Sequence, residues 1–163
     1  MSASVRVRHW PVLLTLLVAL SLEVTPLPAN LAPWRPPWLA LIALYWVLAY
    51  PRRYGLVLAW LAGLVLDVLK GGVLGQHALA MTVATWLVLH FHLRIRVFPV
   101  WQQTAAIGAA VAAHQFLVFW VDGVAGDAVL NWSRLSPTAA ALLAWPLLVV
   151  ILDRLRLQLR MQP

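Results

Sequence analysis

The stretch YGLVLAWLAGLVLDVLKGG, from Tyr54 to Gly72, decides how this chain folds. It is an apolar run that follows the turn-forming sequence Pro51-Arg52-Arg53 and ends at Lys70-Gly71-Gly72, where two glycines break a helix. The pattern predicts a membrane-spanning helix over residues 54–69, with a polar turn on each side. Such a helix is short, because the hydrocarbon core of a bilayer needs about 20 apolar residues.

The composition of the whole chain agrees with a membrane location. Of the 163 residues, 63% are hydrophobic and 10% are charged, whereas ordinary soluble domains carry about 25% charged residues. A surface that faces water cannot be built from so few charges, so membrane lipid must cover most of the protein. This excludes a soluble enzyme, a secreted disulfide-bonded scaffold and a disordered adaptor. Because the chain contains no cysteine, a disulfide, a thiolate metal site and a cysteine nucleophile are excluded too.

Apolar runs bounded by charge or proline recur along the chain and predict six spans. The first run follows basic residues, as in a signal peptide, but no small-residue cleavage site comes after it, so we expect a retained helix. The second and third runs are short, and they either thin the bilayer or extend into neighbouring loop residues. A polar stretch over residues 122–136 precedes the last span. The predicted spans cover residues 10–28, 37–50, 54–69, 74–93, 100–121 and 137–152.

The basic residues predict how these spans are oriented, because cytoplasmic loops are enriched in lysine and arginine. With the N-terminus inside, nine of the 12 basic residues fall on the cytoplasmic side, and a five-span arrangement would place the C-terminal arginines outside. The nine are Arg6, Arg8, Arg52, Arg53, Arg94, Arg96, Arg154, Arg156 and Arg160, and the other three are Arg35, Lys70 and Arg134.

The predicted fold class is therefore an all-α, polytopic membrane protein. We expect one transmembrane domain, a bundle of six transmembrane helices with both termini cytoplasmic. The net charge of +7 then reflects membrane orientation, so membrane lipid is an expected partner and nucleic acid is not.

Asp67 is the acidic residue that most needs an explanation. It lies one turn before the end of the third predicted span, where an ionised side chain is costly and where the helix dipole also disfavours negative charge. A partner or an aqueous cavity is therefore expected. Lys70 is nearest in sequence, while His77 and Arg134 could approach in the fold. A second interpretation stays open, in which Asp67 lies at the headgroup level, held by Lys70 or water, with no further role.

Asp67 also ends a stripe of small residues. Ala59, Gly63 and Asp67 are spaced four apart and therefore lie on one face of the third predicted helix. Small residues at this spacing let helices approach closely in lipid, so the stripe predicts a tightly packed seam that the acid closes.

A comparable stripe runs along the fifth predicted span through Ala106, Ala110 and His114, with Gly108 and Ala112 as a second small pair. Helix packing is the expected role of these residues. We expect His114 to hydrogen-bond to a neighbouring helix rather than to carry protons.

The remaining polar residues do not form a catalytic pattern. Ser133 and Ser136 have no histidine near them in sequence, and His90 and His92 point to opposite sides of a helix, so they could not share a metal. We expect no catalytic residue, metal or cofactor, and an intramembrane hydrolase is disfavoured. Two further acids lie near predicted membrane edges, where we expect them to be solvated or paired: Glu23 and Asp153.

Several fragments in the middle of the chain resemble the family of bacterial rod shape-determining protein MreD. The resemblance covers residues 43–103, and its specificity comes from the order of the pieces. It adds Pro51, Gly71, Gly75 and His77 to the candidates Asp67, Gly63, Ala59 and Lys70. The fragments are ALYW (43–46), PRRYG (51–55), GLVLDVLKG (63–71), LGQHAL (74–79) and FPVWQQ (98–103).

The resemblance implies a non-enzymatic scaffold subunit of the cell-elongation machinery, a multi-pass protein of the bacterial inner membrane. Its implied partner is the bitopic membrane protein MreC. Through the machinery it would work with MreB, RodA and penicillin-binding protein 2 in peptidoglycan synthesis.

The family is also similar in fold to vitamin-binding subunits of membrane transporters, so a small-molecule binding subunit is the alternative function. Such a subunit needs polar groups that converge on an outward-facing cavity. The outer side offers few: Glu23, Asp67, Lys70, His77, Asp122, Asp127, Asn131 and Arg134.

Overall fold

The computed structural model describes residues 9–126 and 134–160, and this part of the chain is all helical, with no β-strand. Six α-helices occupy the six predicted places, which confirms the predicted fold class. One short 3-10 helix, η1, lies between the first two. The helices are α1 (Trp10–Val24), η1 (Ala32–Trp34), α2 (Trp38–Ala49), α3 (Leu56–Lys70), α4 (Gln76–Ile95), α5 (Val100–Ala125) and α6 (Ser136–Arg160).

Most helix ends lie within a few residues of the predicted ends, and the largest differences have local causes. Helix α1 ends at Val24 instead of residue 28, because Pro26 and Pro28 cannot continue the hydrogen-bonded ladder. Helix α6 continues past the apolar run to Arg160, since arginine, leucine and glutamine are good helix formers in water as well as in lipid.

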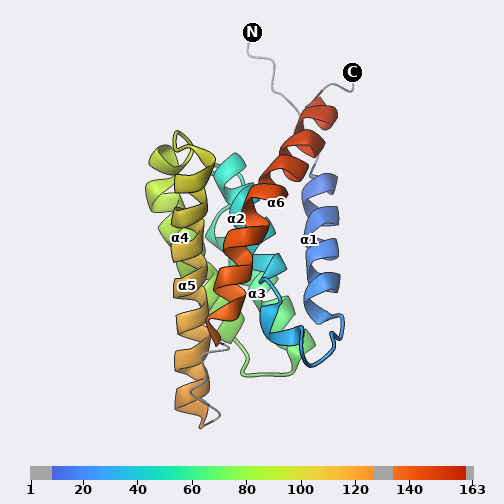
Figure 1. Ribbon diagram of the computed structural model, residues 1–163, viewed down its shortest axis with the longest axis vertical. Coiled ribbons are helices and arrows are strands. Elements are labelled where there is room, and N and C mark those ends of the chain that lie inside the picture. Colours follow the sequence, from blue (N-terminus) through green and yellow to red (C-terminus); the bar gives the residue numbers. More distant parts are fainter. Residues whose placement is uncertain (1–8, 127–133, 161–163) are drawn as a thin grey trace.

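The helices lie side by side and run alternately up and down the bundle (Figure 1). Helix α1 begins and helix α6 ends at the same end of the molecule, the upper end in Figure 1. Helices α4, α5 and residues 136–158 of α6 are long and apolar enough to cross a membrane, and α1 is apolar but shorter. The chain is therefore a multi-pass membrane protein. Which side of the membrane the upper end faces stays a prediction.

Helix α2 lies in the middle of the bundle. Its residues from Leu39 to Leu48 are all buried, and it contacts every other α-helix. A helix that is apolar on all sides must be surrounded by lipid or by protein, and here protein surrounds it. This burial accounts for an apolar run that is too short to span a bilayer with its own surface.

The outer faces of the other helices expose large apolar side chains. On α1 these include Leu13, Leu17 and Val18, and on α6 they include Leu143 and Leu147. In water such a surface would be unstable, whereas lipid covers it without cost.

Candidate functional site at the start of helix α4

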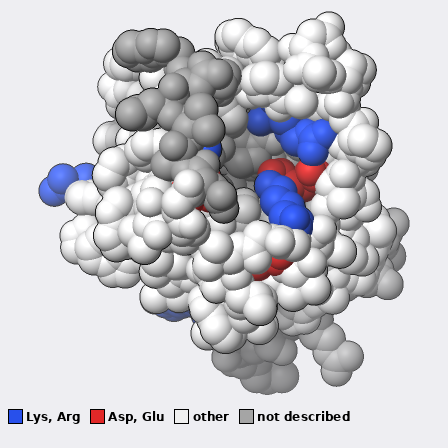
Figure 2. All heavy atoms as spheres, turned by 90° about the horizontal axis from the view of Figure 1, so that it is seen from below, with Lys and Arg blue, Asp and Glu red and all other residues white. Residues whose placement is uncertain are grey.

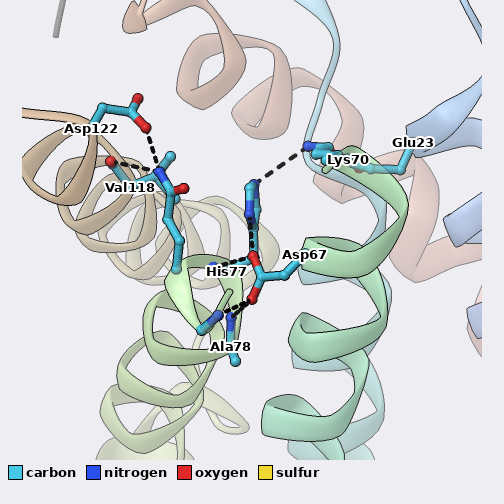
Figure 3. Close-up of polar contacts among 9 residues, drawn as sticks. Glu23, Asp67, Lys70, His77, Ala78, Val118 and Asp122 are labelled. Atoms are coloured by element: carbon cyan, nitrogen blue, oxygen red, sulfur yellow. Dashed lines mark hydrogen bonds and ion pairs between the residues drawn. The ribbon is translucent and has the colours of Figure 1, made fainter. Parts of the chain in front are cut away.

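Asp67 lies near the end of α3 and is almost completely buried, with 1% of its surface exposed. Its carboxylate accepts four hydrogen bonds, all from the first turn of α4 (Figure 3). Oδ1 accepts from the backbone N–H of His77 at 2.8 Å and lies 2.9 Å from its ring Nδ1. Oδ2 accepts from the backbone N–H groups of Gly75 at 2.9 Å and Ala78 at 3.2 Å. The acid therefore fastens α3 to α4.

Helix α4 needs this outside carboxylate because its own N-cap position is Gly75, which has no side chain to accept a hydrogen bond. The first N–H groups of a helix have no partner within it, and the helix dipole adds partial positive charge there. Asp67 supplies both the acceptor and the negative charge. The unfavourable position at the end of its own helix is thus offset by the favourable position at the start of the next.

Two glycines shape the turn that makes this contact possible. Gly71 ends α3 with a φ of 65°, and its N–H bonds to the backbone carbonyl of Asp67 at 3.0 Å. Gly75 has a φ of 95° where α4 begins. Both angles lie in the left-handed region, which a side chain disfavours. Gly71 and Gly75, which the sequence analysis named as candidates, therefore each have a conformational reason to be glycine.

A chain of polar contacts continues outward from Asp67 (Figure 3). The Lys70 ammonium lies 3.5 Å from Nε2 of His77 and 3.1 Å from Oε1 of Glu23, which is itself buried. With its proton on Nδ1, His77 donates to Asp67 and accepts from Lys70 at Nε2. Of the partners considered for Asp67, the structure places His77 beside it, whereas Lys70 pairs with Glu23.

The predicted stripe on α3 packs directly against α4. Ala59 is fully buried, and a Cβ atom added to Gly63 would lie 2.4 Å from the Cα atom of Ala78 and 2.7 Å from the carbonyl oxygen of His77. These neighbours are backbone atoms, which a side-chain rotation cannot move. The backbones of α3 and α4 therefore approach each other closely at Gly63, one helical turn before Asp67 in the sequence of α3.

The second stripe, on α5, lies against the same helix. Ala110 is buried and Ala106 packs against the core, while the ring of His114 lies 6.1 Å from the ring of His77, measured between centroids. The prediction that His114 bonds to a neighbouring helix is wrong. It is buried, and neither ring nitrogen has a hydrogen-bond partner among the residues that the structure describes.

Other polar groups at this end pair with one another. Gln76 donates to the Val118 carbonyl at 3.0 Å and to Asp122 at 2.5 Å, and Arg134 contacts the other oxygen of Asp122 at 2.7 Å. Seen from this end, acidic and basic side chains gather around a hollow in a surface that is mostly uncharged (Figure 2). Five residues named in the sequence analysis lie outside the described residues: Arg6, Arg8, Asp127, Asn131 and Ser133.

The described residues contain no group of three or more histidine, aspartate or glutamate side chains that could hold a metal ion. His92 contacts the carbonyl oxygen of Leu89 through Nδ1, whereas the ring of His90 stacks on Trp86. The Ser136 hydroxyl donates to the Pro33 carbonyl at 2.6 Å. Pro51 lies in the turn between α2 and α3 and touches none of the Asp67 contacts.

Two of the polar contacts that were not predicted from sequence are instructive. Asp67 caps a helix other than its own, and Asp153 accepts a hydrogen bond from the Tyr45 hydroxyl at 2.5 Å at the opposite end of the bundle. The first had a sequence signal: no serine, threonine, aspartate or asparagine precedes the apolar run at Gln76, so the cap had to come from elsewhere. The second had none, because 108 residues separate the partners.

Together, the fold and this internally paired cluster define a polytopic helical membrane protein whose buried polar residues join its helices. Residues 5–155 match the family of the rod shape-determining protein MreD, and the chain belongs to that family. It is 28% identical over 144 residues to the rod shape-determining protein MreD of Haemophilus influenzae, across 88% of this chain and 89% of that protein. No solved structure matches the chain. The family identifies a membrane protein of the rod-shape system.

Proposed function

We propose that this protein is a non-enzymatic scaffold subunit of the cell-elongation machinery in the bacterial inner membrane, where it binds MreC and supports peptidoglycan synthesis. Family membership supports the proposal. The structural observation that carries it is the state of Asp67: the most buried acid uses its hydrogen bonds to join two helices. A carboxylate occupied in this way serves rigidity rather than proton transfer.

The proposal includes an orientation with both termini in the cytoplasm. Three pairs of arginines belong to the upper end of Figure 1: Arg52 and Arg53 in the turn after α2, Arg94 and Arg96 at the end of α4, and Arg154 and Arg156 in the last turns of α6. Arg35, Lys70 and Arg134 belong to the lower end. A reporter that requires the cytoplasm should be active when it is fused after Pro163, and a reporter that requires the periplasm should be inactive there. A reporter active only in the periplasm would overturn this orientation.

Copurification tests the partner. The tagged chain is extracted from membranes of a rod-shaped bacterium in mild detergent, and we expect the bitopic MreC protein to copurify with it. Gly63→Leu should lose the complex because it separates α3 from α4, whereas Gly55→Ala should keep it, since nothing lies within 4 Å of the added Cβ atom. Full recovery of MreC with Gly63→Leu, at normal abundance, would contradict the proposed platform.

A small-molecule binding subunit is the second candidate, and one observation favours it. The hollow in Figure 2 is lined by charge, and the buried His114 has unused hydrogen-bonding capacity nearby. If this function is correct, purification in mild detergent should yield a stoichiometric small molecule detectable by mass spectrometry, and MreC should be absent from the preparation.

A further inference from the structure

The opposite end of the bundle contains a basic cleft that takes no part in the Asp67 contacts. It lies between the turn that joins α2 to α3 and the last turns of α4, and it encloses about 860 Å³. This volume falls within the range of small-molecule sites. Three arginines and a histidine belong to its wall, together with apolar residues of α4. The wall consists of Ala49, Tyr50, Pro51, Arg52, Arg53, Leu89, His92, Leu93 and Arg96.

No negatively charged side chain belongs to the wall of this cleft, although Arg96 also lines a neighbouring pocket that contains Asp153. Among the described residues, Arg52, Arg53 and Arg96 form no ion pair, and no carboxylate belongs to the wall. The nearby Arg156 lies over the ring of Tyr50, 5.0 Å from its centroid, and adds a further cation beside the cleft. Several uncompensated cations at one place repel each other, so a bound anion would stabilise the arrangement. Guanidinium groups match phosphate well because they donate paired hydrogen bonds.

The rest of the wall indicates what carries that phosphate. Leu89 and Leu93 belong to the side of α4 below the arginines, and 72% of the Leu93 surface is exposed. The cleft thus places a cationic rim next to an apolar helix surface. This arrangement is complementary to a phospholipid, whose anionic headgroup lies next to its apolar acyl chains. A soluble phosphate would use the arginines but not the leucines.

We propose that the basic cleft binds the headgroup phosphate of an anionic phospholipid, with the acyl chains lying along α4. Arg52, Arg53 and Arg96 hold the phosphate, and Leu89 and Leu93 contact the chains. This site lies at the other end of the bundle from Asp67 and does not depend on the proposed scaffold function.

Native mass spectrometry of the full-length protein tests the site. The protein is delipidated in a neutral detergent and titrated with phosphatidylglycerol, with phosphatidylethanolamine and with inorganic phosphate. Arg53→Gln combined with Arg96→Gln removes two cations from the wall. Arg94→Gln combined with Arg154→Gln is the matched control, because it removes two exposed cations from the same end that are not part of the wall.

The variant with Arg53→Gln and Arg96→Gln should raise the Kd for phosphatidylglycerol about 30-fold. Each basic residue near a membrane surface strengthens binding of anionic lipid about fivefold, and two are removed. The control should change it less than about threefold, and phosphatidylethanolamine should bind more weakly than phosphatidylglycerol. Equal losses in both double variants would overturn the site, because binding would then follow net charge alone. Inorganic phosphate that binds as tightly as the lipid would overturn the lipid assignment.

Discussion

Helix α4 has a stripe of small residues packed against it on each side, and each stripe ends in a buried polar residue. On α3 the stripe ends in Asp67, whose carboxylate accepts four hydrogen bonds from the first turn of α4. On α5 it ends in His114, whose two ring nitrogens have no partner in the described part of the chain. Two patterns that look alike in sequence therefore end in opposite hydrogen-bonding states.

The difference shows that spacing determines where a polar residue is placed but not whether it is bonded. The start of a helix has only four N–H groups without a partner in the helix itself. At the start of α4, three of these groups donate hydrogen bonds to Asp67. A charged acceptor binds them more strongly than a neutral imidazole would. We infer that Asp67 supports the fold, whereas the capacity of His114 is available for something other than folding.

Removing the Asp67 carboxylate should have the largest effect. Asp67→Ala leaves three N–H groups at the start of α4 and the His77 ring without this acceptor. Loss of one partner from a buried charged contact typically costs about 3 to 5 kcal/mol. Asp67→Asn keeps one acceptor oxygen and should fall between wild type and Asp67→Ala. Thermal unfolding in detergent, followed by the fluorescence of the ten tryptophans, measures the effect.

Rod shape provides the second readout for Asp67, by complementation of a strain depleted of its own MreD, with membrane abundance checked by immunoblot. Asp67→Ala should fail to restore rods. Restored rods at normal abundance, together with an unchanged unfolding temperature, would show that the α3 stripe is ordinary packing.

Closing the space at Gly63 should have the next largest effect. Gly63→Ala places a Cβ atom 2.4 Å from the Ala78 Cα atom and 2.6 Å from its nitrogen, so the two helices must separate. Overpacking typically costs about 1 to 3 kcal/mol, and here the rigid backbone favours the upper part of that range. Gly55→Ala, with no neighbour within 4 Å, is the control and should unfold like wild type. Similar unfolding of the two variants would rule out the close seam.

Gly108 on α5 should tolerate a methyl group better than Gly63. Its added Cβ atom would meet the Leu142 side chain of α6, 2.3 Å from Cδ2, and that side chain is 39% exposed and free to rotate away. We expect Gly108→Ala to destabilise by about 1 kcal/mol or less in the same unfolding assay. A loss as large as that of Gly63→Ala would mean that α5 and α6 are held as tightly as α3 and α4.

The sequence predicts the helices well because charge, glycine and proline interrupt the apolar runs, as at Arg52-Arg53 and Gly71-Gly72. It does not distinguish α2, which is surrounded by protein, from a helix that faces lipid, because both environments select apolar residues. It identifies Asp67 as a residue in need of a partner and His77 as one candidate. It does not identify the backbone N–H groups of α4 as partners, since such groups are common to every residue. The hydrogen bond predicted for His114 is absent for a related reason, because whether a buried ring meets a donor or an acceptor depends on three-dimensional placement.

Replacing His114 should have the smallest effect on stability. This variant tests the contrast with Asp67 most directly. An unpaired buried polar group disfavours folding, so an apolar side chain of similar size, as in His114→Leu, should leave the unfolding temperature unchanged or raise it slightly. His77→Leu is the matched comparison on α4 and should lower the temperature, because it removes a donor to Asp67. A strong loss of stability in His114→Leu would show that the imidazole is bonded in the membrane after all. If the variant folds normally and restores rods, packing is the whole role of the α5 stripe. If it folds normally but fails to restore rods, the two free ring nitrogens serve a ligand or a partner, and the two stripes differ in function as well as in bonding.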